Sequence, residues 1–124
     1  NSRDIALHKI KQAHSILKAA CLIDDISLHC AAIGGLPGPY VRSFLEAIGD
    51  TGIATLISHY KDSSCKVVCN IAYATDDGSC MLFEGILHGS IVSPRGTRLT
   101  HATSWNAIVQ PSGLDRTFAE MTLE

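Results

Sequence analysis

The chain has 124 residues, of which 46% are apolar, and its formal net charge is −2. This length and apolar content suit one folded domain over residues 1–124 and exclude a disordered chain. The small net charge excludes a basic nucleic-acid tail or a polybasic membrane patch, and no apolar run reaches the roughly 20 residues of a membrane helix. We therefore expect a cytoplasmic protein that binds neither nucleic acid nor membranes.

The first predicted element is an amphipathic helix over residues 4–19, because apolar side chains recur at three- and four-residue steps. A brief apolar strand over residues 21–23 follows. Two acids, Asp24 and Asp25, are expected at its carboxyl end, where ligands collect in open α/β sheets. Adjacent carboxylates repel each other, so a bound metal ion, a lysine or bulk solvent should lie beside them.

Two helices and a long hairpin follow a compact GGLPGP turn. The hairpin is predicted from two segments rich in β-branched and aromatic residues around the turn sequence DDGS. A bend is expected at Gly85 or Gly89. In chain order these elements are a helix over 41–48 that ends at Gly49, a helix over 53–60, and strands over 66–75 and 80–92.

The carboxyl-terminal part begins with the turn SPRG, and a last short strand is predicted over residues 105–109. Thr117 and Glu120 then form the T-x-x-E pattern of a capping box, which announces a helix. Four residues follow Glu120, and the chain has no initiator methionine. We therefore expect a domain that is truncated at both ends.

Five cysteines, an odd number, argue against a disulfide framework. Cys65 and Cys69 are spaced C-x3-C, with His59 before them and Cys80 after them, so a zinc site is an alternative. Structural zinc sites usually have tighter, paired ligand spacings. We therefore expect reduced thiols that pack as small hydrophobic side chains.

Four sequence pieces occur in order: IDD, GGLPGPYVRSFLEAIG, GSIVSPRG and W-x-x-I-x-Q-P-S-G-x-x-x-T-F-A-E-M. In them the chain resembles the inosine triphosphate pyrophosphatase family, whose members hydrolyse non-canonical purine nucleoside triphosphates such as ITP, dITP and XTP. The resemblance implies Mg²⁺-dependent cleavage of the α–β phosphoanhydride bond, which yields a nucleoside monophosphate and pyrophosphate.

The resemblance also implies roles for single residues at the phosphates. Asp25 matches the family's catalytic carboxylate, and with Asp24 it would bind the metal ion, in agreement with the preference of Mg²⁺ for carboxylate oxygens. Lys9 falls where the family has a lysine that reaches toward the triphosphate. A lysine on an amphipathic helix can equally face solvent. Arg95, in the turn SPRG, could steer phosphate or be solvated.

Trp105, Asn106 and Thr103 match the family's base-binding motif, F-G-W/Y-D-P. The indole can form one wall of a purine pocket or belong to the core. The chain departs from the motif because it reads TSWNA, in which Thr103 replaces the stacking phenylalanine and Asn106 replaces the aspartate. Loss of the phenyl ring removes about 1–3 kcal/mol of base stacking, so the resemblance leaves purine selectivity open.

Further departures concern the phosphate site. Ile26 stands where the family has a serine or threonine. The family's [ST]-x-N-x-x-K loop, a glutamate metal ligand and its E-K-N-x-x-S-H-R segment do not occur in these 124 residues.

We predict an α/β fold from these patterns: a mixed twisted sheet with flanking helices, a long hairpin that forms a second lobe, and a nucleotide cleft between the lobes. The resemblance implies a homodimer. The leading hypothesis for function is a nucleoside triphosphate pyrophosphatase. Two alternatives are a catalytically impaired relative that acts as a nucleotide-binding or protein-interaction module, and an α/β domain unrelated to nucleotides.

Overall fold

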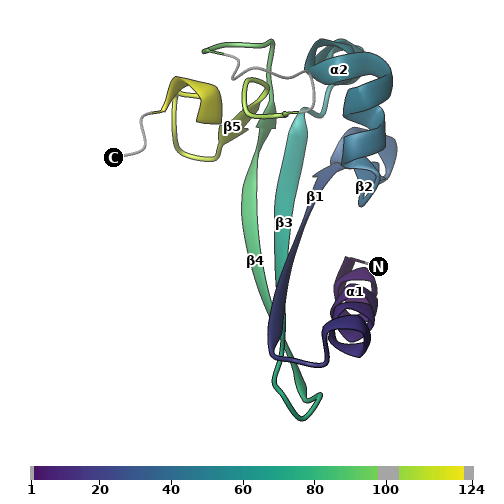
Figure 1. Cartoon of the computed structure of the whole chain (residues 1–124). Helices are drawn as coiled ribbons and strands as arrows, with labels where there is room; N and C mark the ends of the chain where they lie inside the picture. The colour runs from purple at the N-terminus through teal and green to yellow at the C-terminus, as the bar shows by residue number, and fades with distance from the viewer. Residues whose placement is uncertain (1, 98–103, 122–124) are drawn as a thin grey trace. The chain divides into compact units, whose positions relative to one another are not determined.

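The computed structural model describes residues 2–97 and 104–121 (Figure 1). In chain order the elements are α1 (Ser2–Leu17), β1 (Cys21–Cys30), the 3₁₀ helix η1 (Ala31–Ile33), β2 (Pro37–Gly38), α2 (Val41–Ser58), β3 (Ser64–Ala74), β4 (Cys80–Ile91), β5 (Val109–Pro111) and the 3₁₀ helix η2 (Phe118–Glu120). Within the described ranges, no helix has the length and apolar character needed to cross a membrane.

The strands form one sheet in the order β2-β1-β3-β4-β5. β1 pairs antiparallel with β2, where Leu28 lies opposite Gly38, and β4 pairs antiparallel with β5, where Gly89 lies opposite Pro111. The predicted α/β class with flanking helices is confirmed. The β1–β2 and β4–β5 pairings are antiparallel where the sequence predicted a mixed sheet, and β3 and β4 are joined by a tight turn, as predicted (Figure 1).

The chain divides into two compact units. The first comprises Asn1–Ser27 and Val68–Ile86, and the second comprises Leu28–Val67 and Leu87–Glu124. β1, β3 and β4 each contribute residues to both units, and the outer part of the β3–β4 hairpin belongs to the first. The nucleotide cleft between two lobes stays a prediction.

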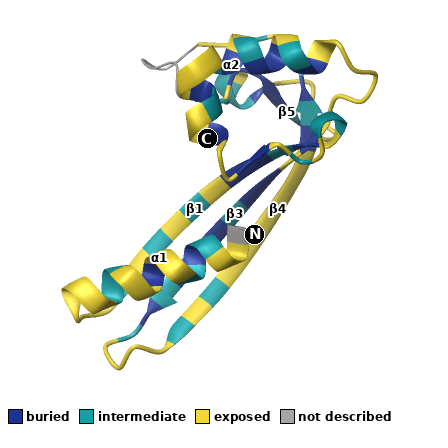
Figure 2. Cartoon of the chain, turned by 90° about the vertical axis from the view of Figure 1, so that its right-hand side faces the viewer, coloured by how far each residue is buried: buried dark blue, intermediate teal, exposed yellow. Residues whose placement is uncertain are grey.

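The first unit is built on the predicted amphipathic helix. Ala6 and Ile10 of α1 are fully buried and pack with Ala72 and Ala74 of β3, and Figure 2 shows buried positions on both elements in dark blue. Burial of a side chain such as Ile10 contributes about 1.5–3 kcal/mol. The helix ends just before Lys18, whose backbone is left-handed with a φ of 52°.

The second unit has the larger core. Leu45, Ile53 and Ile57 of α2 are buried together with Leu28 of β1 and with Ile108. The apolar faces of α2 and of the sheet therefore cover each other within this unit, as the two-layer packing of helices on a sheet requires.

Gly49 divides α2 into two halves. Its φ of 70° and ψ of 176° are not helical, and glycine adopts such a backbone at the lowest cost. The second half begins at Asp50, whose carboxylate accepts the backbone N–H of Thr51 at 2.7 Å. The predicted end of the first helix at Gly49 is confirmed, and the second helix, predicted over residues 53–60, runs from Asp50 to Ser58.

The strand predicted over residues 105–109 is wrong. Residues from Trp105 to Ile108 form a turn, in which the Ile108 N–H donates to the Trp105 carbonyl at 3.1 Å, and β5 begins at Val109. Ala107, Ile108 and Val109 are all buried. A buried turn therefore resembles a buried strand in the sequence, because a short apolar run has no periodicity that separates the two.

All five cysteines are free. Burial raises the pKa of the Cys30 thiol to about 11 and that of the Cys65 thiol to about 12, so both stay protonated and pack as small apolar groups. Among the described residues, no group of three or more His, Cys, Asp or Glu side chains is placed to hold a metal ion. The zinc alternative therefore finds no support in the structure.

The turn between β3 and β4 depends on Asp77. Its carboxylate accepts hydrogen bonds from the Thr75 hydroxyl and the Ser79 N–H, and these lower the pKa of Asp77 from 3.8 to about 2. A lowered pKa means that the contribution to stability is complete above the ordinary value and is lost as the pH falls through about 2. We expect the Ser79 amide signal in NMR spectra to titrate with a midpoint near pH 2.

The matched control for this titration is the neighbouring acid. Asp76→Asn should leave the Ser79 midpoint unchanged, because Asp76 is bonded instead to the backbone N–H of Ala20, at 2.8 Å. Asp77→Asn should abolish the titration. A midpoint at the ordinary value of 3.8 in the unaltered protein would show that these hydrogen bonds do not form in solution.

Candidate functional site

Asp24 and Asp25 lie in the middle of β1 and not at the end of a strand, so the predicted position is wrong. The strand continues to Cys30, and exposed and half-buried residues alternate through both acids. Successive strand residues point to opposite faces: Asp24 is exposed, whereas Asp25 is half-buried. This divergence reduces the repulsion between the two carboxylates.

Lys9 is the neighbour that the structure provides for Asp25. The Lys9 Nζ donates to Asp25 Oδ1 at 3.3 Å, and the two side chains are 48% and 21% exposed. Burial of Ile10 holds α1 on the sheet, and Asp25 shares the face of β1 from which Cys21 and Ile23 pack into the same cluster. The core of the first unit therefore positions this ion pair.

The Lys9–Asp25 pair combines two chemical functions at the surface of the first unit. A carboxylate can bind a hard cation or orient a water molecule, and an ammonium can hold a phosphate oxygen. An ion pair at this exposure is worth only about 0–1 kcal/mol. A ligand can therefore separate the two groups at little cost.

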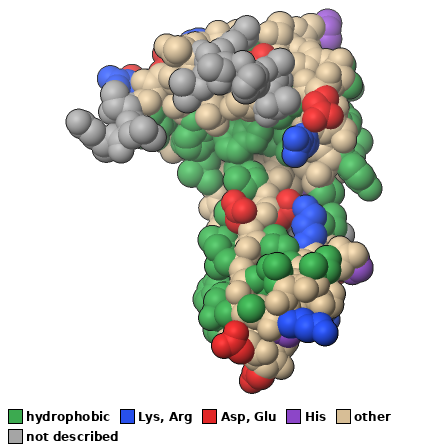
Figure 3. Space-filling view, in the orientation of Figure 1, with side chains coloured by type: hydrophobic (Ala, Val, Ile, Leu, Met, Phe, Trp, Pro, Cys, Tyr) green, Lys and Arg blue, Asp and Glu red, His purple; other side chains and the backbone are tan. Residues whose placement is uncertain are grey.

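The face of β1 that carries Asp24 is different in character. Leu22 and Ile26 lie on the same face by alternation, and they are 65% and 42% exposed. Figure 3 shows that hydrophobic side chains, in green, reach the molecular surface. Ile26, a departure noted in the sequence, therefore lies on the face opposite Asp25 and does not alter the Lys9–Asp25 pair.

Trp105 and Asn106 belong to the second unit. The Trp105 ring meets Phe118 edge-on, with centroids 5.5 Å apart and an angle of 75°, and it is half-buried against the core. Asn106 is exposed, and its carbonyl accepts the Ala119 N–H at 2.9 Å. The third predicted base contact, Thr103, lies outside the described residues.

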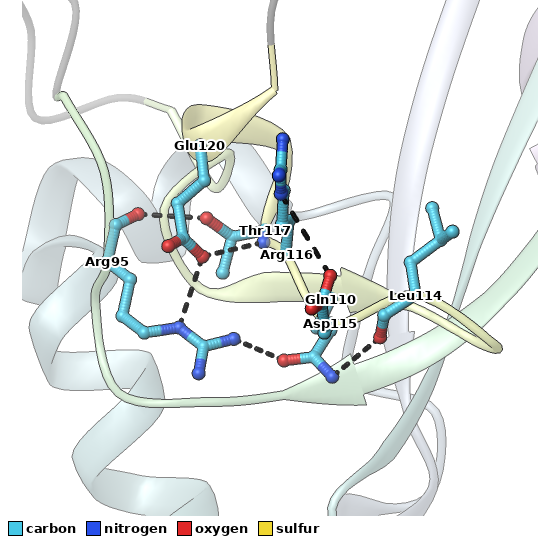
Figure 4. Close-up of polar contacts among 7 residues, drawn as sticks. All are labelled: Arg95, Gln110, Leu114, Asp115, Arg116, Thr117 and Glu120. Carbon is cyan, nitrogen blue, oxygen red and sulfur yellow. Dashed lines mark hydrogen bonds and ion pairs between the residues drawn. The ribbon is translucent and has the colours of Figure 1, made fainter.

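Arg95 is the centre of a polar network that the sequence did not reveal (Figure 4). Its Nε lies 3.2 Å from Glu120 Oε1, and its Nη2 donates to the Gln110 side-chain oxygen. Its carbonyl accepts the Thr117 hydroxyl at 2.8 Å. Arg95 thus connects the SPRG turn to β5 and η2, and its visible contacts are structural.

Glu120 completes this network and confirms the predicted capping box. Its Oε1 accepts the Thr117 N–H at 2.9 Å, and the Thr117 side chain accepts in return from the backbone of η2. The Thr117 N–H and the Arg95 charge hold the pKa of Glu120 below its ordinary value. The capping box therefore fixes the amino-terminal end of η2. The edge contact of Phe118 with Trp105 places η2 next to the Trp105 turn.

The chain is similar in sequence to known proteins over its whole length. A sequence model described as the Ham1 family matches residues 1–124. An inosine triphosphate pyrophosphatase from Batrachochytrium dendrobatidis is 39% identical over 120 residues, which are 97% of this chain and 62% of that protein. One from Schizosaccharomyces pombe is 39% identical over 123 residues, with coverages of 98% and 64%. The chain thus spans less than two thirds of the length of these curated relatives.

Solved structures are similar as well. A nucleoside-triphosphatase / dITP/XTP pyrophosphatase from Mycobacterium abscessus superposes with a TM-score of 0.80 at 26% identity, covering 98% of this chain and 66% of that one. The Staphylococcus aureus Ham1 protein has a TM-score of 0.81 at 23% identity, with coverages of 95% and 63%. The second likeness concerns the fold alone.

Proposed function

Because the chain belongs to the Ham1 family, we propose that this protein hydrolyses non-canonical purine nucleoside triphosphates, such as ITP, dITP and XTP, to the monophosphate and pyrophosphate. Relatives that are 39% identical are named inosine triphosphate pyrophosphatase. The observation that carries the proposal is the contact between Lys9 and Asp25. It places a carboxylate that suits a metal ion beside a cation that suits a phosphate oxygen, and hydrolysis of a metal-bound triphosphate uses groups of both kinds.

Asp25 has the principal role in the proposed site. Its carboxylate suits Mg²⁺, which proteins usually hold through one or two carboxylates together with substrate phosphates. When bound, the ion would polarise the phosphoryl oxygens and offset their charge. Asp25 would also orient a water molecule toward the phosphorus. Lys9 would release Asp25 and bind a phosphate oxygen of the substrate.

Asp24 does not share this role in our proposal. The sequence predicts that both acids bind the ion, but alternation along β1 sends the Asp24 side chain to the opposite face. A single ion cannot be ligated from both faces of one strand without distortion of the backbone. We therefore keep Asp25 alone as the metal ligand supplied by β1.

The base-binding role stays with Trp105, Asn106 and Thr103. The exposed part of the indole offers a face on which a purine can stack. The exposed Asn106 amide can donate to and accept from a base edge. The altered TSWNA sequence supports weaker stacking than a phenylalanine at residue 103 would give.

The direct test uses protein expressed from the complete coding region. Incubation with ITP, dITP or XTP and Mg²⁺ should release pyrophosphate, and a chelator should stop the release. ATP serves as the control nucleotide and should be a poorer substrate. Saturable binding of ITP without release would favour the impaired nucleotide-binding relative. The absence of both binding and release would contradict both functions.

Two further properties stay proposals, and the resemblance implies the first of them. We propose that the protein is a homodimer and that it acts in the cytoplasm. Sedimentation of the purified protein tests the first, and a monomer at micromolar concentration would contradict it. Fractionation of cells tests the second.

Replacement of Lys9 by methionine should raise the KM for ITP by about tenfold, because a hydrogen bond to a charged group is lost. Methionine keeps most of the aliphatic stem, so α1 should stay packed. Lys11→Met is the matched control, since Lys11 is an exposed lysine of the same helix, and its KM should not change. Equal KM values for both variants would show that Lys9 does not bind the substrate.

A further inference from the structure

The second unit contains a cavity of about 190 Å³ to which no role is assigned above. Three basic side chains line it: His29 of β1, Lys66 of β3 and His88 of β4. These strands are neighbours in the sheet order. Among the described residues that line the cavity, none is acidic. The cavity therefore gathers basic groups from three adjacent strands, and none of its described lining residues carries a carboxylate.

The rest of the wall carries no charge. Ala31 and Gly35 contribute apolar surface, and the buried Cys65 thiol, whose pKa is raised to about 12 by burial, stays neutral. The Ser64 hydroxyl donates a hydrogen bond to Asp62 Oδ1 at 2.6 Å. Asp62 itself does not line the cavity. Ser64, Lys66 and His88 are exposed, so the cavity is open to solvent and an anion can reach the basic groups.

The His29 imidazole lies against the glycine turn and makes a hydrogen bond with the Gly35 backbone. A Cβ on Gly35 would lie 3.8 Å from the His29 Nδ1, and a Cβ on Gly38 would lie 3.6 Å from its Cε1. Desolvation, and then the positive charge of Lys66, lowers the pKa of His29. The two basic groups therefore act on each other across the cavity, and a bound negative charge would relieve this repulsion.

The chemistry of the donors defines the ligand. Imidazole and ammonium groups present N–H donors, and an ammonium has no acceptor for a metal ion. The part of the chain that the structure describes also holds no group of three His, Cys, Asp or Glu side chains suited to a metal. A carboxylate offers two oxygens, whereas a phosphate offers more acceptor oxygens to donors that arrive from three strands, and lysine binds phosphate as a point charge.

We propose that this cavity binds a small phosphate-type oxyanion through His29, Lys66 and His88. Inorganic phosphate and pyrophosphate both have this chemistry. Neither the geometry nor the test depends on the hydrolytic function, because Lys9, Asp25 and Trp105 do not line the cavity.

Binding should depend on pH. The titratable groups that face the cavity are His29 from β1, Cys65 and Lys66 from β3, and His88 from β4. Of these, His29 gains a proton only below its ordinary pKa, because desolvation and the Lys66 charge lower that pKa. Asp62 does not contribute to this pH dependence of binding, because hydrogen bonds from Ser64 lower its pKa. Protonation of His29 should therefore favour the anion, and because phosphate itself gains a proton near neutral pH, the affinities are compared for the same ionic form of the anion.

The test is titration of the full-length protein with inorganic phosphate and, separately, with pyrophosphate, in the absence of nucleotide and Mg²⁺. Calorimetry reports affinity, and the imidazole Hε1 NMR signals report the place of binding. We expect saturable binding of at least one anion, with shifts of the His29 and His88 signals. Lys66→Met and His88→Asn should each weaken binding by about tenfold or more, as for a lost hydrogen bond to a charged group.

Two matched controls remove the same groups elsewhere in the second unit. Lys61→Met and His59→Asn change an exposed lysine and an exposed histidine that do not line the cavity, and both should bind as the unaltered protein does. Thermal unfolding without anion checks each fold, and His88→Asn decides the matter if Lys66→Met does not fold. The proposal is overturned if neither anion binds, if acetate binds as tightly as phosphate, or if cavity and control variants bind equally.

Discussion

Replacement of Asp25 by asparagine should lower kcat for release of pyrophosphate from ITP by about 100- to 10,000-fold, the range for loss of a group that activates water. Asparagine keeps the shape but loses the negative charge, so it binds a divalent cation weakly and cannot accept a proton. The variant also loses the ion pair with Lys9. At that exposure the loss costs about 0–1 kcal/mol of stability, so the fold should persist and initial rates should report on the chemistry.

Asp24→Asn is the matched control, because it makes the same change of charge one residue away. Asp24 leaves β1 on the opposite face, and its charge is exposed and screened by salt, so we expect less than about a tenfold effect on kcat. Equal losses in the two variants would contradict the assignment of the site to one face of β1. An unchanged rate in Asp25→Asn would contradict the catalytic role itself.

Gly96→Ala should lower the free energy of unfolding by about 2–5 kcal/mol, as the sum of backbone strain and a steric clash. Gly96 has a φ of 98°. A Cβ at this position would lie 2.6 Å from the carbonyl carbon of Ala119 and 2.8 Å from its Cβ. Because the Ala119 N–H is bonded to the Asn106 carbonyl, η2 cannot move without loss of that bond. Urea denaturation with an unchanged m-value measures the effect.

Gly113→Ala separates the two causes of this loss. Gly113 has a similar φ of 84°, but a Cβ there would meet no atom within 4 Å. Strain alone should cost about 1–2 kcal/mol, so the difference between the two variants gives the cost of the contact with Ala119. Equal losses would show that η2 yields to the added methyl group.

Several parts of the fold were predictable because their causes lie within a few residues. Periodic apolar residues encode the helix predicted over 4–19. One glycine encodes the interruption of α2, and the DDGS sequence encodes the β3–β4 turn. The capping box of Thr117 and Glu120 also formed as predicted. In each case the physical signal, a missing Cβ, a side-chain acceptor or a helical period, acts locally.

The predictions that were wrong concern short apolar runs whose conformation depends on residues far away along the chain. The strand predicted to stop before Asp24 continues through both acids, because pairing with neighbouring strands outweighs the low strand propensity of aspartate. The run at residues 105–109 is buried as a turn. Burial alone does not distinguish these conformations in a sequence, since the partner strand is far away along the chain.

By itself, the sequence determined the family and the α/β class, and it singled out Asp25 as the proposed catalytic residue. Only the tertiary structure decided which side chains meet: Lys9 with Asp25 across 16 positions, Arg95 with Gln110 across 15, and His29 with Lys66 and His88 around one cavity. The physical reason is strand order and register. These depend on which apolar faces cover one another, and a shift of one residue would turn every side chain of a strand to the opposite face.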